Sequence, residues 1–233
     1  MKHKKLSSIK RMVKNTIDDF SMINKGDKLL LGVSGGKDSM ALADILADFQ
    51  EVYSFHLKVC YIKGSYDGNN HSLPEEIRMF FYEKNIDYCE ESMNLNEEDL
   101  PMNCKRCSFN RRKTLFVIGD KLGCNKIAVG HNKNDLAETV LMNIFTGGNC
   151  FSYLPISDYF HGKFYLIRPF YYVSTSAIIS YVRNHNIPVL KNSCPLSETA
   201  GRSLMRHIIS IAKDKYPQVE ENILKLENNL LKN

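Results

Sequence analysis

The chain has 233 residues, of which 43% are apolar and 24% charged, a composition typical of globular domains rather than disordered or fibrous proteins. Its formal charge of +5 permits a polyanionic partner without requiring one. No run of about 18 uncharged apolar residues occurs, and no apolar stretch follows the basic N-terminus as a secretory signal would require. The sequence therefore predicts no membrane span and favours a cytoplasmic protein.

Strands and helices are predicted to alternate along most of the chain. Strands are expected at residues 28–33, 55–62, 86–92, 126–131 and 163–170, the first being the continuous apolar run of a strand covered on both faces. Helices are expected at residues 7–19, 38–49, 74–84, the second half of 104–123, 134–145, 174–185 and the C-terminal end, broken at Pro217. Such alternation implies βαβ units, so the sequence predicts an α/β fold with a parallel five-stranded sheet and a helical C-terminal extension.

A glycine-containing turn follows the first predicted strand and leads directly into a helix. Its sequence is "SGGKDS", formed by Ser34, Gly35, Gly36, Lys37, Asp38 and Ser39. Backbone N–H groups, the helix dipole and two hydroxyl groups would face an occupant of this turn and make it an anion site. The order of Lys37 and Asp38 does not fit a Walker loop. Asp38 would repel phosphate unless a cation such as Mg²⁺ lay between them; a plain strand-to-helix turn is the alternative.

A second motif follows the fourth predicted strand. "SGGKDS" resembles the PP-loop of the ATP pyrophosphatase family, and "AVGHNKNDLAETV" is similar to the G-H-x-x-D-D-x-x-E-T segment of that family, with Asn134 in place of the first Asp. The resemblance implies cleavage of ATP between its α- and β-phosphates, and ATP contacts from the six loop residues, Gly130 and His131. It also implies Asp38 and Asp135 as catalytic Mg²⁺ ligands. Alternatively, Asn134 could simply cap the helix that follows it.

Seven cysteines in a chain without an export signal favour metal or redox chemistry over a disulfide framework. Cys104 and Cys107 form a C-x-x-C pair, predicted on a loop that enters a helix, and Cys194 is the candidate third ligand. A zinc site would need a fourth ligand at a short spacing, whereas three thiolates on a cubane cluster leave one iron open. Cys60 and Cys89 lie within predicted strands, where buried apolar positions are expected.

Four stretches extend the resemblance over nearly the whole chain: "IDDFSMINKGDKLLLGVSGGKDS", "CKRCSFNRRKTLF", "KIAVGHNKND" and "RSLMRHIISIAKDKYP". They resemble the tRNA 2-thiolation enzymes of the tRNA-cytidine(32) 2-sulfurtransferase type. This resemblance implies a [4Fe–4S] cluster on Cys104, Cys107 and Cys194, a catalytic Arg111 facing the nucleotide, and a homodimer. It also implies three segments, namely a basic N-terminal helix (1–24), a PP-loop domain (25–172) and an extension with the third cysteine (173–233).

Two clusters of basic residues indicate a polyanionic partner. Residues 1–15 hold six Lys and Arg and no acid, and residues 105–113 hold five and no acid. A solvated surface would account for either cluster alone, but with the resemblance they favour tRNA. The predicted RNA contacts are Lys105, Arg106, Arg112, Lys113, Arg202 and Arg206.

These features together predict one reaction. The C2 oxygen of a tRNA cytidine would attack the α-phosphate of ATP, pyrophosphate would leave, and sulfur delivered through the cluster would replace the adenylated oxygen. A cysteine desulfurase or free sulfide would be the sulfur donor. Two alternatives stay open. The first is a PP-loop ligase like tRNA-Ile lysidine synthetase, which needs no cysteines, and the second is a non-enzymatic nucleotide-binding module with structural zinc.

Overall fold

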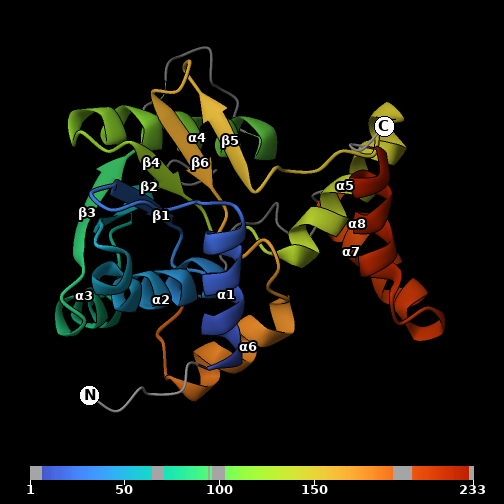
Figure 1. Cartoon of the computed structure of the whole chain (residues 1–233), viewed down its shortest axis with the longest axis horizontal. Helices are drawn as coiled ribbons and strands as arrows, with labels where there is room; N and C mark the ends of the chain where they lie inside the picture. The colour runs from blue at the N-terminus through green and yellow to red at the C-terminus, as the bar shows by residue number, and fades with distance from the viewer. Residues whose placement is uncertain (1–6, 65–70, 94, 96–102, 191–200, 231–233) are drawn as a thin grey trace.

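The structure is a computed structural model that describes residues 7–64, 71–93, 95, 103–190 and 201–230. Its centre is a six-stranded sheet in the order β3-β2-β1-β4-β6-β5 (Figure 1), in which every strand except β5 runs parallel to its neighbours. The strands are β1 (Lys28–Val33), β2 (His56–Lys63), β3 (Asp87–Ser92), β4 (Lys126–Ala128), β5 (Ile156–Tyr159) and β6 (Phe164–Ile167). The predicted α/β class is confirmed.

The prediction of five parallel strands was wrong in number. The additional strand, β5, pairs with β6 in antiparallel orientation, with Ile156 opposite Ile167. Its sequence, ISDY, is short and half polar, so it contains no apolar run of the kind that marks the other strands. A tight turn with positive φ at Phe160, His161 and Gly162 joins β5 to β6.

Helices cover both faces of the sheet. Figure 1 shows α4 (Cys104–Lys121) on one face and, on the other, α1 (Ser8–Asp19), α2 (Lys37–Tyr53), α3 (Glu75–Glu83) and α6 (Thr175–Asn184). Each face has its own apolar core: Leu29 and Leu31 of β1 pack on the side of α1, α2, α3 and α6, and Leu30 packs on the side of α4. Because β1 is buried on both faces, it reads as a continuous apolar run.

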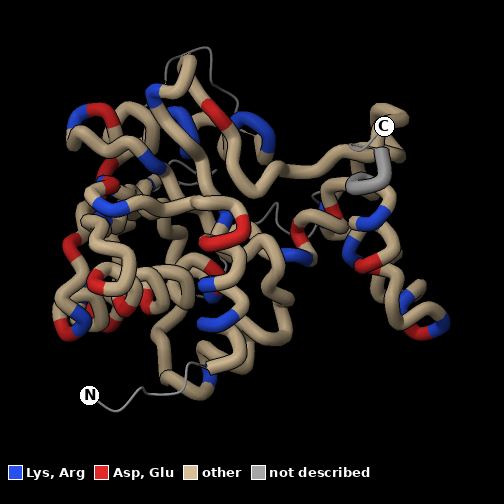
Figure 2. Tube along the Cα trace, viewed as in Figure 1, with Lys and Arg blue, Asp and Glu red and all other residues tan. Residues whose placement is uncertain are grey.

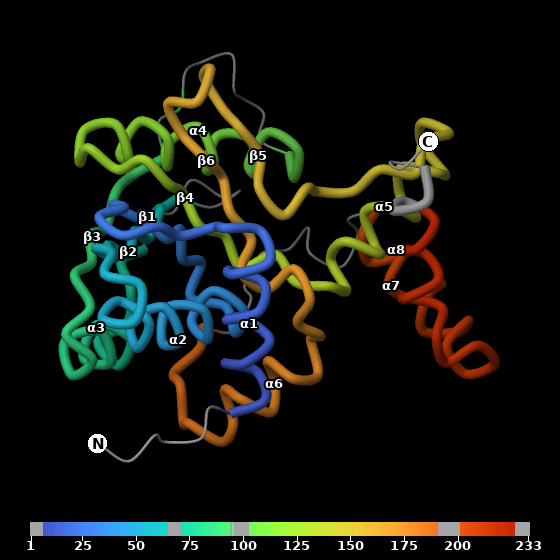
Figure 3. The backbone as a smooth tube through the Cα atoms, in the orientation of Figure 1, coloured from blue at the N-terminus to red at the C-terminus, as the bar shows by residue number. Residues whose placement is uncertain are grey.

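Three further helices lie beside the sheet: α5 (Lys133–Gly147), α7 (Gly201–Lys215) and α8 (Val219–Leu230). α7 and α8 contact α5 and each other, and Figure 3 shows them projecting away from the main body. By contrast, α6 packs against α1 and α2 and buries Ile178 and Tyr181 in the larger core. The segment boundary at residue 173 stays a prediction.

The carboxyl ends of β1, β2 and β4 meet at one edge of the sheet, hereafter the carboxyl edge. In open α/β sheets ligands bind outside this edge, at the point where the strand order reverses, which here lies between β1 and β4. Both sequence motifs follow these two strands. Within the described residues no helix is both long and apolar enough to cross a lipid bilayer.

Candidate active site

The turn after β1 is held in shape by its own serine hydroxyls. Gly35 has a φ of +75°, and α2 begins directly afterwards at Lys37 with Gly36 as its N-cap. Ser39 Oγ accepts a hydrogen bond from the Ser34 N–H at 3.2 Å and donates to the Gly36 carbonyl at 3.0 Å. Ser34 Oγ accepts from the Gly36 N–H at 3.3 Å. The turn is therefore formed before any ligand binds, at the positive end of the α2 dipole, where phosphate is favoured.

Leu190 closes one side of this turn. Its N–H donates to the Gly35 carbonyl at 2.8 Å, and a Cβ at Gly35 would lie only 2.3 Å from Leu190 Cδ1. Both the positive φ and the close contact require glycine here. Leu190 is the last described residue before residues 191–200, so the described part of the chain before this gap stops beside the turn.

Asp38 and Asp135 are joined through Asn132 at the carboxyl edge. The Asn132 Nδ2 donates to Asp38 Oδ1 at 3.0 Å, and the Asn132 backbone N–H donates to Asp135 Oδ2 at 2.9 Å. Lys37 Nζ contacts the other oxygen of Asp38 at 2.7 Å. Sequence reasoning missed Asn132. Its place three residues before an acid, the spacing of a capping box, is the signal that could have revealed it.

The electrostatics of Asp135 fit a cation site. Burial raises the pKa of Asp135 and the charge of Asp38 adds to this effect, whereas the hydrogen bond from Asn132 lowers it. A divalent cation between the two carboxylates would stabilise both ionised forms, and the all-oxygen donor set suits Mg²⁺. A Cβ at Gly130 would lie 3.1 Å from the Ser39 nitrogen, so the segment just after β4 touches the start of α2.

Asn134 has a structural role. The N-cap of α5 is Asn132, in a capping box with Asp135, so the alternative in which Asn134 caps the helix is wrong. Asn134 Oδ1 accepts from the Thr175 N–H at 2.8 Å, and its Nδ2 donates to Glu220 Oε1 at 2.6 Å. Since an ionised carboxylate cannot donate a hydrogen bond to Glu220, the amide suits this position better than the aspartate of the motif.

His131 lies in a ring stack after β4. Its imidazole stacks on the Tyr153 ring with the centroids 4.8 Å and the planes 8° apart. Burial, and then the charges of three arginines, lower the pKa of His131 to about 3, so the ring is neutral at physiological pH. Its Nδ1 is buried and has no hydrogen-bond partner. The contact of His131 with nucleotide stays a prediction.

The first turn of α4 carries the cysteine pair. The helix begins at Cys104, after Asn103, whose side chain accepts from the Arg106 N–H at 2.9 Å, so the prediction that the pair precedes the helix was wrong. An N-cap directly before the pair accounts for this early start. Cys104 is exposed and Cys107 half-buried, one helical turn apart. Cys194 lies outside the described residues, within which no cluster of three potential metal ligands occurs.

The basic residues at positions 105–113 of α4 fall into two groups. Figure 2 marks the positions of Lys and Arg along the chain in blue. Arg111 donates to the carbonyls of Ile62 at 3.1 Å and Gly64 at 2.6 Å, which holds its guanidinium at the carboxyl end of β2. The other four are exposed or half-exposed, namely Lys105, Arg106, Arg112 and Lys113. Their roles in catalysis and in RNA binding stay predictions.

Two arginines of α7 bind α5. Arg206 makes two hydrogen bonds, of 2.7 and 3.1 Å, to the buried carboxylate of Glu138. Arg202 donates to Thr139 Oγ1 at 3.4 Å and to the Tyr153 hydroxyl. Both guanidinium groups therefore fix α7 to the helix that carries Asp135, a role that the sequence did not predict. Their predicted contact with RNA stays a prediction.

Comparison with known proteins decides the family. The family model described as a PP-loop domain matches residues 1–213. The chain belongs to the PP-loop family. A tRNA-cytidine(32) 2-sulfurtransferase from Nitrosospira multiformis is 33% identical, with 98% of this chain and 78% of that protein covered. One from Geobacter sulfurreducens is 30% identical, with 95% and 89% covered. Within the PP-loop family the chain is of this type, an ATP-dependent tRNA sulfurtransferase, which confirms the resemblance.

Two solved structures agree with the fold. The U34-tRNA thiolase NcsA from Methanococcus maripaludis, solved with its [4Fe–4S] cluster, has a TM-score of 0.79 at 22% identity, with 96% of this chain and 78% of that chain covered. NMN synthetase from Francisella tularensis has a TM-score of 0.51 at 13% identity, with 95% and 92% covered. At these identities the likeness establishes the fold alone.

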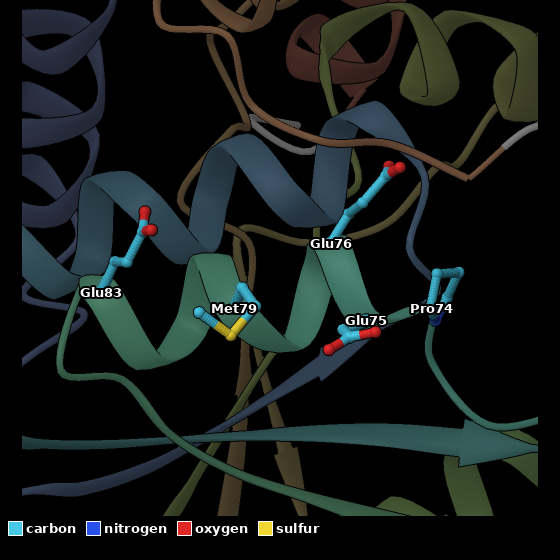
Figure 4. A pocket seen from close by; sticks show the side chains of 5 residues that line it. All are labelled: Pro74, Glu75, Glu76, Met79 and Glu83. Atoms are coloured by element: carbon cyan, nitrogen blue, oxygen red, sulfur yellow. The ribbon is translucent and has the colours of Figure 1, made fainter.

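A surface pocket of about 610 Å³ on the sulfurtransferase lies along α3 (Figure 4). Its lining residues are Pro74, Glu75, Glu76, Met79 and Glu83. Three carboxylates and no basic side chain line it, so it repels the phosphates of a nucleotide or an RNA. Because it also contains no residue of either motif, it is not the candidate active site.

Proposed function

We propose that this sulfurtransferase adenylates the C2 oxygen of a cytidine in tRNA and replaces that oxygen with sulfur supplied through a [4Fe–4S] cluster. The observation that carries the proposal is the link between the PP-loop turn after β1 and the carboxylates of Asp38 and Asp135, which Asn132 joins. The helix α4, which begins with Cys104 and Cys107, is tied by Arg111 to the carboxyl end of the neighbouring strand β2. The curated relatives are tRNA-cytidine(32) 2-sulfurtransferases, and their name supplies the substrate class.

The first proposed step is adenylation. The C2 oxygen attacks the α-phosphorus of ATP, the bond from that phosphorus to the bridging oxygen breaks, and pyrophosphate leaves. The turn of residues 34–39 binds the triphosphate, with Gly130 and His131 beside it. Asp38 and Asp135 would hold Mg²⁺, which would offset the negative charge of the phosphates. Arg111, fixed on the carbonyls after β2, adds a positioned positive charge.

The donor set of α4 fits an iron–sulfur cluster. Two thiols one turn apart can bind one soft metal centre, and a third cysteine is needed to complete a tri-cysteinyl set. Cys194 is the third cysteine of the proposal, and it follows Leu190 by four residues in the sequence. Cys104, Cys107 and Cys194 would hold the cluster, which would supply sulfide-level sulfur; the bond from C2 to this sulfur would form as the bond from C2 to the oxygen of the departing AMP breaks.

The partners belong to the same proposal. The phosphates of tRNA would contact Lys105, Arg106, Arg112, Lys113, Arg202 and Arg206. A cysteine desulfurase or free sulfide would supply sulfur, the protein would act as a cytoplasmic homodimer, and residues 1–24, 25–172 and 173–233 would form its three segments.

C107S tests the proposal, with C150S as a matched control because Cys150 is also half-buried but lies after α5. Each protein is reconstituted anaerobically with iron and sulfide and incubated with ATP and tRNA, and the modified nucleosides are measured by mass spectrometry. We expect 2-thiocytidine from the wild type and C150S, and none from C107S, although C107S still binds ATP. Formation of 2-thiocytidine by C107S at the wild-type rate would refute the proposal.

A further inference from the structure

A buried arginine without a counter-ion lies beside the candidate active site. Arg168 follows β6 and is 2% exposed. Its Nη1 donates to the Leu154 carbonyl and, at 3.1 Å, to Ser157 Oγ, but its Nε is buried without a partner. No carboxylate of the described residues forms an ion pair with it.

More positive charge converges on the same place. The Arg168 Cζ lies 4.9 Å from the centroid of the Tyr153 ring, which also stacks with His131. The Arg202 Cζ lies 5.7 Å from that centroid, and Arg202 donates to the Tyr153 hydroxyl. The charges of three arginines lower the pKa of His131: Arg168 just after β6, Arg202 of α7 and Arg112 of α4.

This arrangement is unfavourable without an anion. A buried guanidinium loses its hydration, and that loss is large unless a negative partner replaces the water. Burial accordingly lowers the pKa of Arg168 to about 10, which still leaves the group charged at neutral pH. His131 is neutral and has an unused Nδ1, so the site offers both fixed positive charge and an unpaired polar atom.

We propose that Arg168 and Arg202, which both lie against the Tyr153 ring, bind a single phosphate group of a substrate together with His131. Arginine suits this role because its planar group of donors matches phosphate oxygens. His131 follows Gly130, which touches the start of α2, so the phosphate site adjoins the PP-loop. The inference rests on the proposed function, in which the phosphate belongs either to the RNA chain beside the target cytidine or to ATP.

The test compares the wild type with R168Q, R168K and the control R183Q, which changes an exposed arginine at the end of α6. RNA affinity is measured by fluorescence anisotropy with an anticodon stem-loop over a salt series, and ATP affinity by equilibrium dialysis without RNA. We expect R168Q to weaken one of the two affinities by about tenfold, the size of a lost charge-assisted hydrogen bond. R168K should weaken it less, and R183Q should bind like the wild type.

The two sources of phosphate give different results. Weaker RNA binding, with a salt dependence smaller by about one counter-ion, assigns the phosphate to RNA, and weaker ATP binding assigns it to ATP. Folded R168Q with both affinities unchanged overturns the phosphate site. A wild type that binds neither ligand contradicts the proposed function instead.

A measurement on the wild type covers the case in which R168Q does not fold. Protein labelled with ¹⁵N-histidine is titrated with inorganic phosphate, and the Nδ1 resonance of His131 is followed by NMR. A shift of this resonance with phosphate supports the site. A resonance that does not move overturns it.

Discussion

Asn132 and Asn134 stand two residues apart at the start of α5 and serve different sides of the site. Asn132 donates to Asp38 and caps the helix together with Asp135, whereas Asn134 reaches Glu220 on α8. The neutral amides thus supply hydrogen-bond donors to Asp38 and Glu220, carboxylates that each also pair with a lysine. In the sequence, residues 131–135 are simply five consecutive polar residues. Only the structure shows that Asn132 contacts Asp38 and Asp135, whereas Asn134 contacts α8.

The pKa of His131 predicts an acid-dependent stability. This pKa is about 3 in the folded protein, against an ordinary value of 6.5, so between these values the unfolded chain binds a proton that the folded chain does not. The free energy of unfolding should therefore fall as the pH falls from about 6.5 towards 3. H131F keeps a ring against Tyr153 but cannot titrate, so its stability should fall less.

Urea unfolding at about pH 7 and about pH 5 measures this difference. H207F, at an exposed position on α7, is the matched control. An equal loss of stability in H131F and the wild type would show that His131 does not titrate as described.

The helix α5 connects the catalytic edge to the C-terminal pair of helices through polar contacts. Arg206 of α7 neutralises the buried Glu138, and Lys213 of α7 pairs at 2.8 Å with Glu220 of α8, which also accepts from Asn134. The contacts of α5 with α7 and α8 join residues far apart in the sequence, whereas Lys213 and Glu220 are only seven residues apart. The orientation of α7 and α8 therefore depends on a few charged and amide side chains.

N134D tests this junction. The substitution places a second carboxylate beside Glu220 in place of a donor at 2.6 Å, so we expect a loss of roughly 1–3 kcal/mol in the free energy of unfolding and weaker hydrogen-exchange protection of α8. E220Q in the same chain should recover most of this loss, because a glutamine amide can donate to the new aspartate. A double-mutant cycle gives the coupling. N134D with wild-type stability and unchanged α8 protection would contradict the role of Asn134.

Elements with strong local signals were predictable, and those set by context were not. β1 reads as an apolar run because it is buried on both faces, and the helix of residues 174–185 has an N-cap serine whose Oγ accepts from Ala177 N–H. β5 was missed because it is only four residues long and half polar, so its own sequence carries no strand signal. It becomes a strand through its antiparallel pairing with β6. The fourth strand was predicted over 126–131 but ends at Ala128, since residues 129–132 turn towards the PP-loop.

The sheet order brings the two sequence motifs of the molecule together. Residues 34–39 and 130–135 are distant in sequence, and they meet because β1 and β4 are neighbours. The motifs themselves could be recognised from the sequence, but strand order and the position of Arg168 beside His131 are tertiary facts. In the proposed reaction, the cysteines at the start of α4 would help to deliver sulfur to the same base that ATP activates.

The metal content of the reconstituted protein tests whether Cys104, Cys107 and Cys194 bind one iron–sulfur cluster together. Wild type and C194S are reconstituted anaerobically, and iron and acid-labile sulfide are counted together with the absorption spectrum. A tri-cysteinyl cluster at the PP-loop predicts about four irons and about four sulfides per chain in the wild type, and unstable or absent iron in C194S. Zinc in place of iron in the wild type, or a full iron complement in C194S, would contradict it.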